Sequence, residues 1–484
     1  MDGQQRLATA IVALAAMRDL ARSLDKPPYT KGADFARDIQ REILEKDTEP
    51  SSYSLTLSEL DEPFFLKAIK SDPPAVPSTK LRSHTHIHYA YTLSKTKLEE
   101  VTKGMSIDKT LKRVKSLRDA LTKGITLIAI QVQNEEDAYN IFETLNDRGL
   151  RLSVPDLVLN LLMRRAPDAT ARQLVRQHWN TLMRQMGRRD VSRFLRHMWV
   201  SMYGDLKAEG LYSAIKKNLE QKMLTSVDFA EQCADECEAY VELLDVNVSL
   251  SPQALADLEG LVKYLGFASA PPLLLAGYRC LNASDFAKLL AALVTAYVRY
   301  GLIGNQNPTD LESACFEAAR AIRARSESNE TSAKQLQAAK AILKRLVVSD
   351  TIVEDAAADL ILERSQAVWL MTRLANKLQS ATKEVGMDRA NLEHVFPQNA
   401  GAAWPNRADL EPLIWHIGNL SILGNRINRK AQNKSFADKC SLHYSKSEIK
   451  MTKDLLSYSQ WDEKAIKRRA KTLAKQITQL WPSL

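Results

Sequence analysis

The sequence has few cysteines, and their scarcity bears on where the protein works. Five are present in 484 residues: Cys233, Cys237, Cys280, Cys315 and Cys440. An odd number of scattered cysteines is typical of reduced thiols in a cytoplasmic protein. Two of them are four residues apart, but no second pair lies near, so buried small residues are favoured over a metal site there. We therefore expect a cytoplasmic protein.

Long apolar runs and a leader peptide are also missing. The longest uninterrupted apolar stretches, such as 270–277 and 289–298, are far shorter than the roughly 20 residues of a membrane span. Met1 is followed by polar residues, which argues against a secretory signal. The hydrophobic content of 45% and charged content of 26% are typical of a soluble globular protein, and the length indicates two to four domains. We expect no membrane partner.

Basic residues are concentrated at the C-terminal end. The whole chain carries a net charge of +9, and the stretch from Gly386 onward holds 16 Lys and Arg against 9 Asp and Glu, which gives 16 − 9 = +7. Lysine and arginine release counterions from phosphates, so a basic terminal module suits a polyanionic partner. A solvated basic surface is the alternative.

Helix and strand signals divide the chain into unequal parts. The spacing of apolar residues predicts a helix over 7–24, and strands are predicted at 51–57 and 125–132. Ser153 is a candidate helix N-cap, with Pro155 and Asp156 in the first turn.

From 157 to 384 the apolar residues recur at helical spacing almost throughout. The stretch 164–196 includes nine arginines, which fit either a nucleic-acid-facing helical pair or a solvated helix face. Short segments and turns begin near Gly386. We therefore predict domains at 1–160, 161–385 and 386–484, in a mainly α protein with small α/β parts.

A compact polar cluster follows the second boundary. Glu393-His394-Val395-Phe396-Pro397-Gln398-Asn399 places a carboxylate beside a histidine. Gly418-Asn419-Leu420 follows 25 residues later, and Asn428 lies nine residues after Asn419. The intervening residues are typical of a strand, a turn and a helix. Turn and capping residues around a surface histidine are the alternative interpretation.

Hydrolysis of a phosphodiester explains why these residue types would be grouped. The reaction needs a base that activates water, a cation at the scissile phosphate, and a group that aims the base. A histidine near its ordinary pKa can be the base. A carboxylate and a carboxamide oxygen can hold a hard divalent ion, and a second carboxamide can accept from the other ring nitrogen of the histidine.

The segment resembles the HNH, or ββα-metal, nuclease motif in the form found in the C-terminal domain of GmrSD-type restriction endonucleases. The resemblance implies that His394 is the general base, that Asn419 is the middle residue that orients it, and that Glu393 and Asn428 hold Mg²⁺ or Mn²⁺. Downstream, Asn433-Lys434-Ser435-Phe436 and Lys439 resemble a further family segment. We expect Lys434, Lys439 and Arg429 to contact DNA.

A second signature lies at the N-terminal end. Asp2-Gly3-Gln4-Gln5-Arg6 is predicted to be a short polar loop before a helix, which suits phosphate binding. It resembles the DGQQR signature of the ParB-like α/β domain in GmrSD-type proteins, and residues 142–150 with 152–157 resemble a second block of that domain. The resemblance implies nucleotide binding by Asp2, Gln5 and Arg6, joined by a second group: Asn146, Arg148, Gly149 and Asp156. Turn and capping roles are the alternative for the second group.

The resemblance also implies that residues precede this signature in the family, including a strand. We therefore expect an N-terminally incomplete domain, an unpaired sheet edge and doubtful nucleotide hydrolysis by this chain alone. An upstream fragment or a second copy of the chain is then a candidate partner. His84, His86 and His88 would share one face of a strand, but the surrounding residues favour a helix, on which the three splay apart.

The sequence thus predicts three parts: a partial ParB-like domain, a long helical region and a ββα-metal nuclease. The expected function is restriction of phage or modified foreign DNA with a divalent cation, regulated by a nucleoside triphosphate. Two alternatives remain. One is a DNA- or nucleotide-sensing regulator with an inactive nuclease, and the other is an NTPase regulator whose terminal module only binds DNA.

Overall fold

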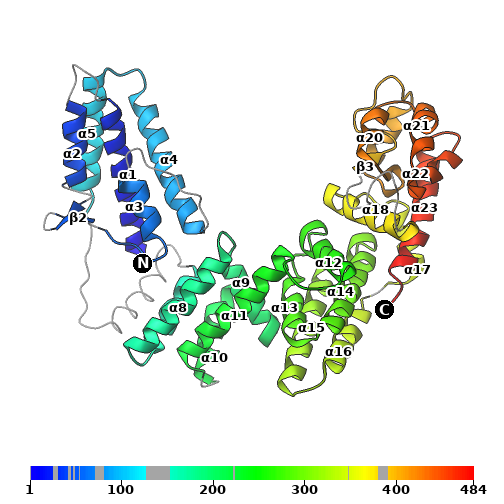
Figure 1. Ribbon diagram of the computed structural model, residues 1–484, viewed down its shortest axis with the longest axis horizontal. Helices are drawn as coiled ribbons and strands as arrows, with labels where there is room; N and C mark the ends of the chain where they lie inside the picture. Colours follow the sequence, from blue (N-terminus) through cyan, green and yellow to red (C-terminus); the bar gives the residue numbers. More distant parts are fainter. Residues whose placement is uncertain are drawn as a thin grey trace. The chain divides into compact units, whose positions relative to one another are not determined.

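The computed structural model is mainly α-helical, as the sequence predicts (Figure 1). It describes residues 2–24, 31–41, 45–46, 49–53, 55–70, 81–126, 153–221, 224–346, 348–379 and 391–484. The chain divides into two compact units. Unit 1 comprises 1–195 and 208–238, and unit 2 comprises 196–207 and 239–484, so the division falls within two helices.

Unit 1 consists of helices and one small strand pair. Its described elements are α1 (Asp2–Ser23), α2 (Lys31–Ile39), β1 (Glu45–Lys46), β2 (Glu49–Tyr53), α3 (Glu62–Lys70), α4 (Arg82–Thr102), α5 (Ile107–Lys123), α7 (Val154–Arg165), α8 (Ala169–Met186), η2 (Ala208–Gly210) and α10 (Leu211–Gln221), together with parts of α9 (Val191–Tyr203) and α11 (Ser226–Asp245). Strands β1 and β2 pair antiparallel.

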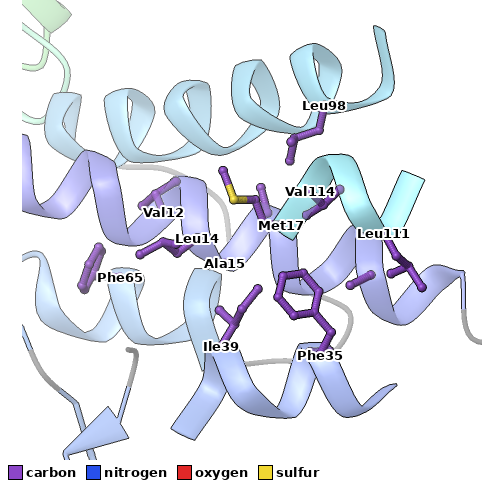
Figure 2. Close-up of a cluster of buried hydrophobic side chains, with 13 residues drawn as sticks. Val12, Leu14, Ala15, Met17, Phe35, Ile39, Phe65, Leu98, Leu111 and Val114 are labelled. Carbon is purple, nitrogen blue, oxygen red and sulfur yellow. The ribbon is translucent and has the colours of Figure 1, made fainter. Parts of the chain in front are cut away.

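The N-terminal core forms around α1, which packs against α2, α4 and α5 (Figure 2). Phe35 and Ile39 of α2 and Val114 of α5 lie in the same buried cluster as Val12 and Ala15 of α1. Small residues on α1 allow the other helices to approach closely, and large side chains fill the space between them. The predicted helix over 7–24 is confirmed and begins earlier than expected.

The other local predictions for unit 1 have mixed outcomes. Ser153 is the N-cap residue of α7, and Pro155 lies in its first turn, as expected. The strand predicted at 51–57 is shorter, because β2 ends at Tyr53 and residues 55–57 lie outside any strand. The strand predicted at 125–132 lies, from 127 onward, outside the described residues. The arginines of 164–196 are exposed or half-buried.

Unit 2 begins with a helical array. Its elements up to residue 379 are α12 (Pro252–Glu259), η3 (Gly260–Tyr264), α13 (Pro271–Cys280), α14 (Ala283–Ala296), η4 (Tyr297–Ile303), α15 (Pro308–Glu327), α16 (Ser332–Lys344), α17 (Asp350–Ala357) and α18 (Arg364–Leu378). Side-chain caps start several of them. Ser251 caps α12 and Asn282 caps α14, each by accepting from a backbone N–H in the first turn.

One stretch of this array, Ala283–Ile303, is long and apolar enough to cross a membrane by length and composition alone. It is the single such stretch among the described residues, and 67% of its most apolar window is buried inside the protein. Arg299 lies within it and donates to the backbone oxygens of Val348 and Trp481. A core helix passes the same test, so the expectation of no membrane partner stays untested.

The end of unit 2 consists of short elements followed by one longer helix, α23, as the sequence predicts. They are β3 (Asn391–His394), α19 (Arg407–Leu410), η6 (Glu411–Leu413), η7 (Ile417–Asn419), β4 (Leu420–Leu423), α20 (Asn425–Ala431), α21 (Phe436–Leu442), η8 (Tyr444–Lys446), α22 (Lys450–Lys453), η9 (Asp454–Ser457) and α23 (Glu463–Leu480). Their core combines aromatic and aliphatic side chains from most of these elements, among them Phe396, Trp404, Tyr444, Trp461 and Ile466.

Candidate active site

Two antiparallel strands followed by a helix hold the predicted site. Strand β3 pairs with β4 in a register that sets His394 opposite Leu420 and Asn391 opposite Leu423. Helix α20 starts directly after β4 and carries Asn428. The strand pair and the helix thus join residues that are 25 to 35 positions apart in the sequence, with His394 at the Leu420 end of the pair and α20 following its Leu423 end.

His394 is the last residue of β3, and its ring is held on two sides. Nδ1 lies 2.9 Å from the backbone oxygen of Ile414. The carbonyl can only accept, so Nδ1 carries the proton and Nε2 carries the lone pair that can accept a proton. The ring also meets the indole of Trp415 edge-on, with the ring centroids 4.6 Å apart. Gln398, which is exposed, lies with its Nε2 at 3.3 Å from the Nε2 of His394.

The environment of His394 favours its neutral form. Burial lowers the pKa of the imidazole below its ordinary value, the bond to Ile414 opposes this effect, and the charges of Lys439 and Arg364 add to the lowering. A neutral imidazole with a fixed tautomer and an outward lone pair is the form that a general base requires.

Asn419 is fully buried, and its side chain makes four hydrogen bonds. Its Oδ1 accepts from the Phe396 N–H at 2.8 Å and from the Trp461 Nε1–H at 3.0 Å. Its Nδ2 donates to the backbone oxygens of Phe396 at 3.0 Å and Ile414 at 3.1 Å. The expected direct bond from the histidine ring to a carboxamide is replaced by one to Ile414, whose carbonyl Asn419 also holds. Asn419 therefore positions His394 through one intermediate group.

The glycine before Asn419 is required by close packing. A Cβ atom on Gly418 would lie 2.1 Å from the backbone oxygen of Ile466 in α23. Arg469, also in α23, is buried and donates to the backbone oxygens of Gly418 and Leu420. Burial lowers the pKa of its guanidinium to about 10. The closing helix therefore fixes the strand that carries Asn419.

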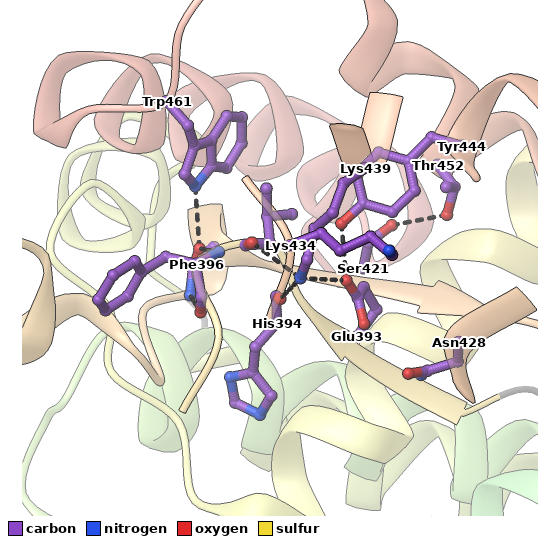
Figure 3. A network of polar contacts seen from close by, with 12 residues as sticks. Glu393, His394, Phe396, Ser421, Asn428, Lys434, Lys439, Tyr444, Thr452 and Trp461 are labelled. Carbon is purple, nitrogen blue, oxygen red and sulfur yellow. Dashed lines mark hydrogen bonds and ion pairs between the residues drawn. The ribbon is translucent and has the colours of Figure 1, made fainter. Parts of the chain in front are cut away.

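Glu393 points into the buried interior of the domain instead of lying on the surface (Figure 3). Its Oε1 accepts from the Lys439 ammonium at 2.8 Å and from the Tyr444 hydroxyl at 2.6 Å. Lys439 also donates to the backbone oxygens of His394 at 2.9 Å and Val395 at 3.1 Å. Every bond described for this carboxylate reaches Oε1, so none of them engages Oε2.

The prediction that Lys439 contacts DNA is wrong. Its side chain is 0% exposed and is engaged by three oxygens, so its ammonium cannot reach a phosphate. Lys439 lies three residues after Phe436 in α21, and both belong to the buried face of that helix. By contrast, the other two predicted contacts, Arg429 and Lys434, are exposed.

Asn428 is half-buried on α20, and its Nδ2 donates to the backbone oxygen of Leu392 in β3 at 3.3 Å. This bond leaves the carboxamide oxygen as the group that is available to a ligand. The helix is thereby held against the strand that carries Glu393 and His394, and Figure 3 shows Asn428 together with these two side chains.

The N-terminal prediction needs one correction. Residues 2–6 form the first turns of α1, so the loop expected there is helical. Gln5 and Arg6 are exposed on that helix, and the side chain of Asp2 lies outside the described part. Three members of the second group, Asn146, Arg148 and Gly149, also lie outside the described residues. Asp156 accepts from the Ser153 hydroxyl at 2.7 Å, which is a capping contact.

The three histidines of 84–88 lie on helix α4, as favoured from the sequence. The Nε2 of His84 lies 3.1 Å from the backbone oxygen of Leu60. No group of three or more His, Cys, Asp or Glu side chains that could hold a metal occurs among the described residues. Cys233 and Cys237 are buried, as expected for small core residues.

His416 is a buried structural residue beside the site. Its Nε2 donates to the backbone oxygen of Ala358 at 2.8 Å, and its Nδ1 accepts from the Gly418 N–H at 3.1 Å. The bond from Gly418 needs the neutral ring, because Nδ1 must accept, and burial lowers the pKa of the imidazole. The contact ties 358–362 to 415–417, where Leu362 and Ile417 add backbone bonds.

Acid should therefore destabilise this part of the protein through His416. The unfolded chain takes up a proton near the ordinary pKa of about 6.5, whereas the folded ring resists protonation until a lower pH. Stability is present above about 6.5 and decreases as the pH falls toward the folded pKa. We expect the urea midpoint of wild type to fall between pH 7.5 and 5.5, and that of His416→Gln to fall less steeply. Equal slopes in the two proteins would contradict this role.

Several site residues were not anticipated in their observed roles. The Ile414 carbonyl, the Trp461 indole and the Tyr444 hydroxyl hold His394, Asn419 and Glu393 respectively. A backbone carbonyl leaves no signal in a sequence. The burial of Lys439 could have been found, because its spacing from Phe436 places both on one face of an amphipathic helix.

The paired strands β3 and β4, together with a neutral His394 whose ring is held by the Ile414 carbonyl, form a site suited to hydrolysis by an activated water. Comparison with known families agrees. Residues 1–163 match the model of the GmrSD restriction endonuclease N-terminal domain, and residues 348–476 match that of the GmrSD restriction endonuclease C-terminal domain. The chain belongs to the GmrSD restriction endonuclease family, and it is a nuclease of the restriction type with DNA as its substrate. No match to a curated protein is found.

Proposed function

We propose that the protein is a metal-dependent DNA endonuclease of the HNH type, with His394 as its general base. The observation that carries the proposal is the bond from Nδ1 to the Ile414 carbonyl, which leaves Nε2 unprotonated at a half-buried position. The order of two strands and a helix, with Asn428 on the helix, supports the same assignment.

In the proposed mechanism, Nε2 of His394 takes a proton from a water molecule whose oxygen attacks the phosphorus of a DNA phosphodiester. A new P–O bond forms, and the bond to the leaving sugar oxygen breaks. Asn419 and Ile414 keep the ring in the productive tautomer throughout, because their bonds do not involve Nε2. Gln398 must release the Nε2 lone pair before water can use it.

The residues present fit a divalent cation. The Oε2 of Glu393 and the Oδ1 of Asn428 are hard oxygen donors that their described bonds do not engage. When bound there, Mg²⁺ or Mn²⁺ would stabilise the negative charge on the phosphate. Two protein donors leave several coordination positions for water and for phosphate oxygens, as is common for Mg²⁺.

Arg429 and Lys434 are proposed to contact the DNA backbone. Both are exposed and close in sequence to α20, which carries Asn428. Removing both charges should weaken DNA binding for all sequences and reduce the slope of log affinity against log salt by about 0.9 per lost contact. Fluorescence anisotropy of a labelled duplex at several salt concentrations measures this slope. Lys471→Ala, at an exposed position on α23, is the matched control, and an unchanged slope in the double variant would refute the contact.

We extend the proposal to nucleotide regulation and to modified phage DNA, with Gln5 and Arg6 as nucleotide contacts. The support is the family of the first 163 residues and the exposure of these two side chains on α1. A cytoplasmic restriction role belongs to the same proposal. Plasmid cleavage on plain and phage-modified DNA, with and without a nucleoside triphosphate, tests these points. Rates that depend on neither variable would refute this extension and leave the nuclease assignment intact.

A further inference from the structure

The Glu393–Lys439 pair has a consequence for how a cation enters the site. Lys439 is buried with its ammonium on the Glu393 carboxylate, so the two charges offset each other. Its two further bonds, to the backbone oxygens of His394 and Val395, hold it in place at the end of β3. The Lys439 ammonium is therefore a fixed part of the site and not a mobile surface charge.

The remaining donors add no negative charge. Asn428 offers a neutral oxygen, and no group of three or more His, Cys, Asp or Glu side chains surrounds the site in the part of the chain that is described. The Glu393 carboxylate is already balanced by Lys439. A divalent ion gains little electrostatic energy from a site of zero net charge.

We propose that this site binds its divalent cation together with DNA, and only weakly in the free protein. The inference rests on the proposed nuclease function. A DNA phosphate supplies the anionic oxygens that the protein lacks, and it completes the ligand set with Glu393 and Asn428. The positive charge of Lys439 then prevents tight metal binding until the DNA substrate is present.

Mn²⁺ binding to full-length protein tests the proposal directly. The protein carries His394→Ala, so DNA is bound without being cut, and free Mn²⁺ is followed by its electron paramagnetic resonance signal at pH 8. Mn²⁺ taken up by DNA alone is subtracted. We expect at least about tenfold tighter binding with duplex DNA than without it, and loss of the added binding in the His394→Ala, Asn428→Ala double variant. Equal affinity with and without DNA would overturn the proposal.

A charge variant tests the role of Lys439. Lys439→Met should tighten Mn²⁺ binding to the free protein by about tenfold or more, because a nearby positive charge is removed. Lys471→Met removes an exposed lysine of α23 and should leave the affinity unchanged. If Lys439→Met misfolds, as thermal melting would reveal, the comparison with and without DNA still decides. Unchanged affinity in a folded variant would overturn the role of Lys439.

The outcomes separate this inference from the proposed function. Tight Mn²⁺ binding without DNA, together with plasmid cleavage by the unmodified protein, refutes the inference and keeps the nuclease. Absence of Mn²⁺ binding even with DNA, together with absence of cleavage, refutes both.

Discussion

Replacing His394 with alanine should slow DNA cleavage by roughly 10²–10⁴-fold, the usual contribution of a general base. The expectation follows from the geometry of the ring. Nδ1 is committed to the Ile414 carbonyl, so Nε2 is the only ring nitrogen that can accept a proton from water. The indole of Trp415 also packs edge-on against the imidazole, with the ring centroids 4.6 Å apart. Initial rates on supercoiled plasmid measure the effect.

Two comparisons show whether the lower cleavage rate of His394→Ala comes from the missing base. Added imidazole should restore part of the rate of His394→Ala, because the truncation leaves space where a free ring can bind. Asn399→Ala, at an exposed position five residues further along, should cleave like wild type. A rate for His394→Ala within a few-fold of wild type would show that another group takes the proton.

Replacing Asn419 with alanine should cost both stability and activity. Four groups lose a partner in the interior: the Phe396 N–H, the Trp461 indole N–H, and the carbonyls of Phe396 and Ile414. Each buried polar group left unsatisfied costs roughly 1–3 kcal/mol, so we expect a loss of about 3 kcal/mol or more. The Ile414 carbonyl, which holds the ring of His394, would also lose its hydrogen bond from Asn419. The rate of cleavage should therefore fall as well.

Thermal unfolding and cleavage rates of one preparation test the Asn419 prediction. A loss of about 3 kcal/mol corresponds to a drop in Tm of roughly 6 °C or more for a domain of this size. Asn399→Ala makes the same chemical change at an exposed position and should leave Tm unchanged within about 1 °C. Asn419→Ala with the Tm of wild type would contradict the positioning role.

The sequence predicted the strand, turn and helix around Asn419 and Asn428, because turn residues separate a short apolar segment from a helical one. His394 and Asn428 lie where the strand-turn-helix pattern places them. The helical nature of 157–379 followed from apolar periodicity, which dominates where long segments pack on one another. The helix start at Ser153 followed from its cap residues.

What the sequence could not provide is the set of contacts between distant segments. Asn419 has the residue type of a group that orients a histidine, yet its bond goes to Ile414, because the 414–418 turn brings a carbonyl between them. Lys439, which lies in a segment that resembles the family, was expected to contact DNA, although a buried carboxylate 46 residues earlier binds it. The sequence shows which charged side chains are present, but only the fold determines which of them form ion pairs.

The prediction of a loop at residues 2–6 was wrong for a local reason. Gln4, Gln5 and Arg6 are good helix formers, and the apolar face that packs against α4 and α2 begins only a few residues later. Continuation of the helix through these residues adds backbone hydrogen bonds at little cost. The signature thus lies on a helix surface, with Gln5 and Arg6 on the exposed side.

A single plasmid assay shows whether the protein cuts DNA with His394 as its base and with the help of a divalent cation. Full-length wild type is incubated with supercoiled plasmid in Mg²⁺, beside the same reaction with EDTA and beside His394→Ala in Mg²⁺. We expect nicked or linear plasmid in the first reaction and intact plasmid in the other two. Cleavage that persists in EDTA or in His394→Ala would contradict it. Intact plasmid in all three, on both plain and phage-modified DNA and with nucleotide present, would instead favour a sensing protein with an inactive nuclease.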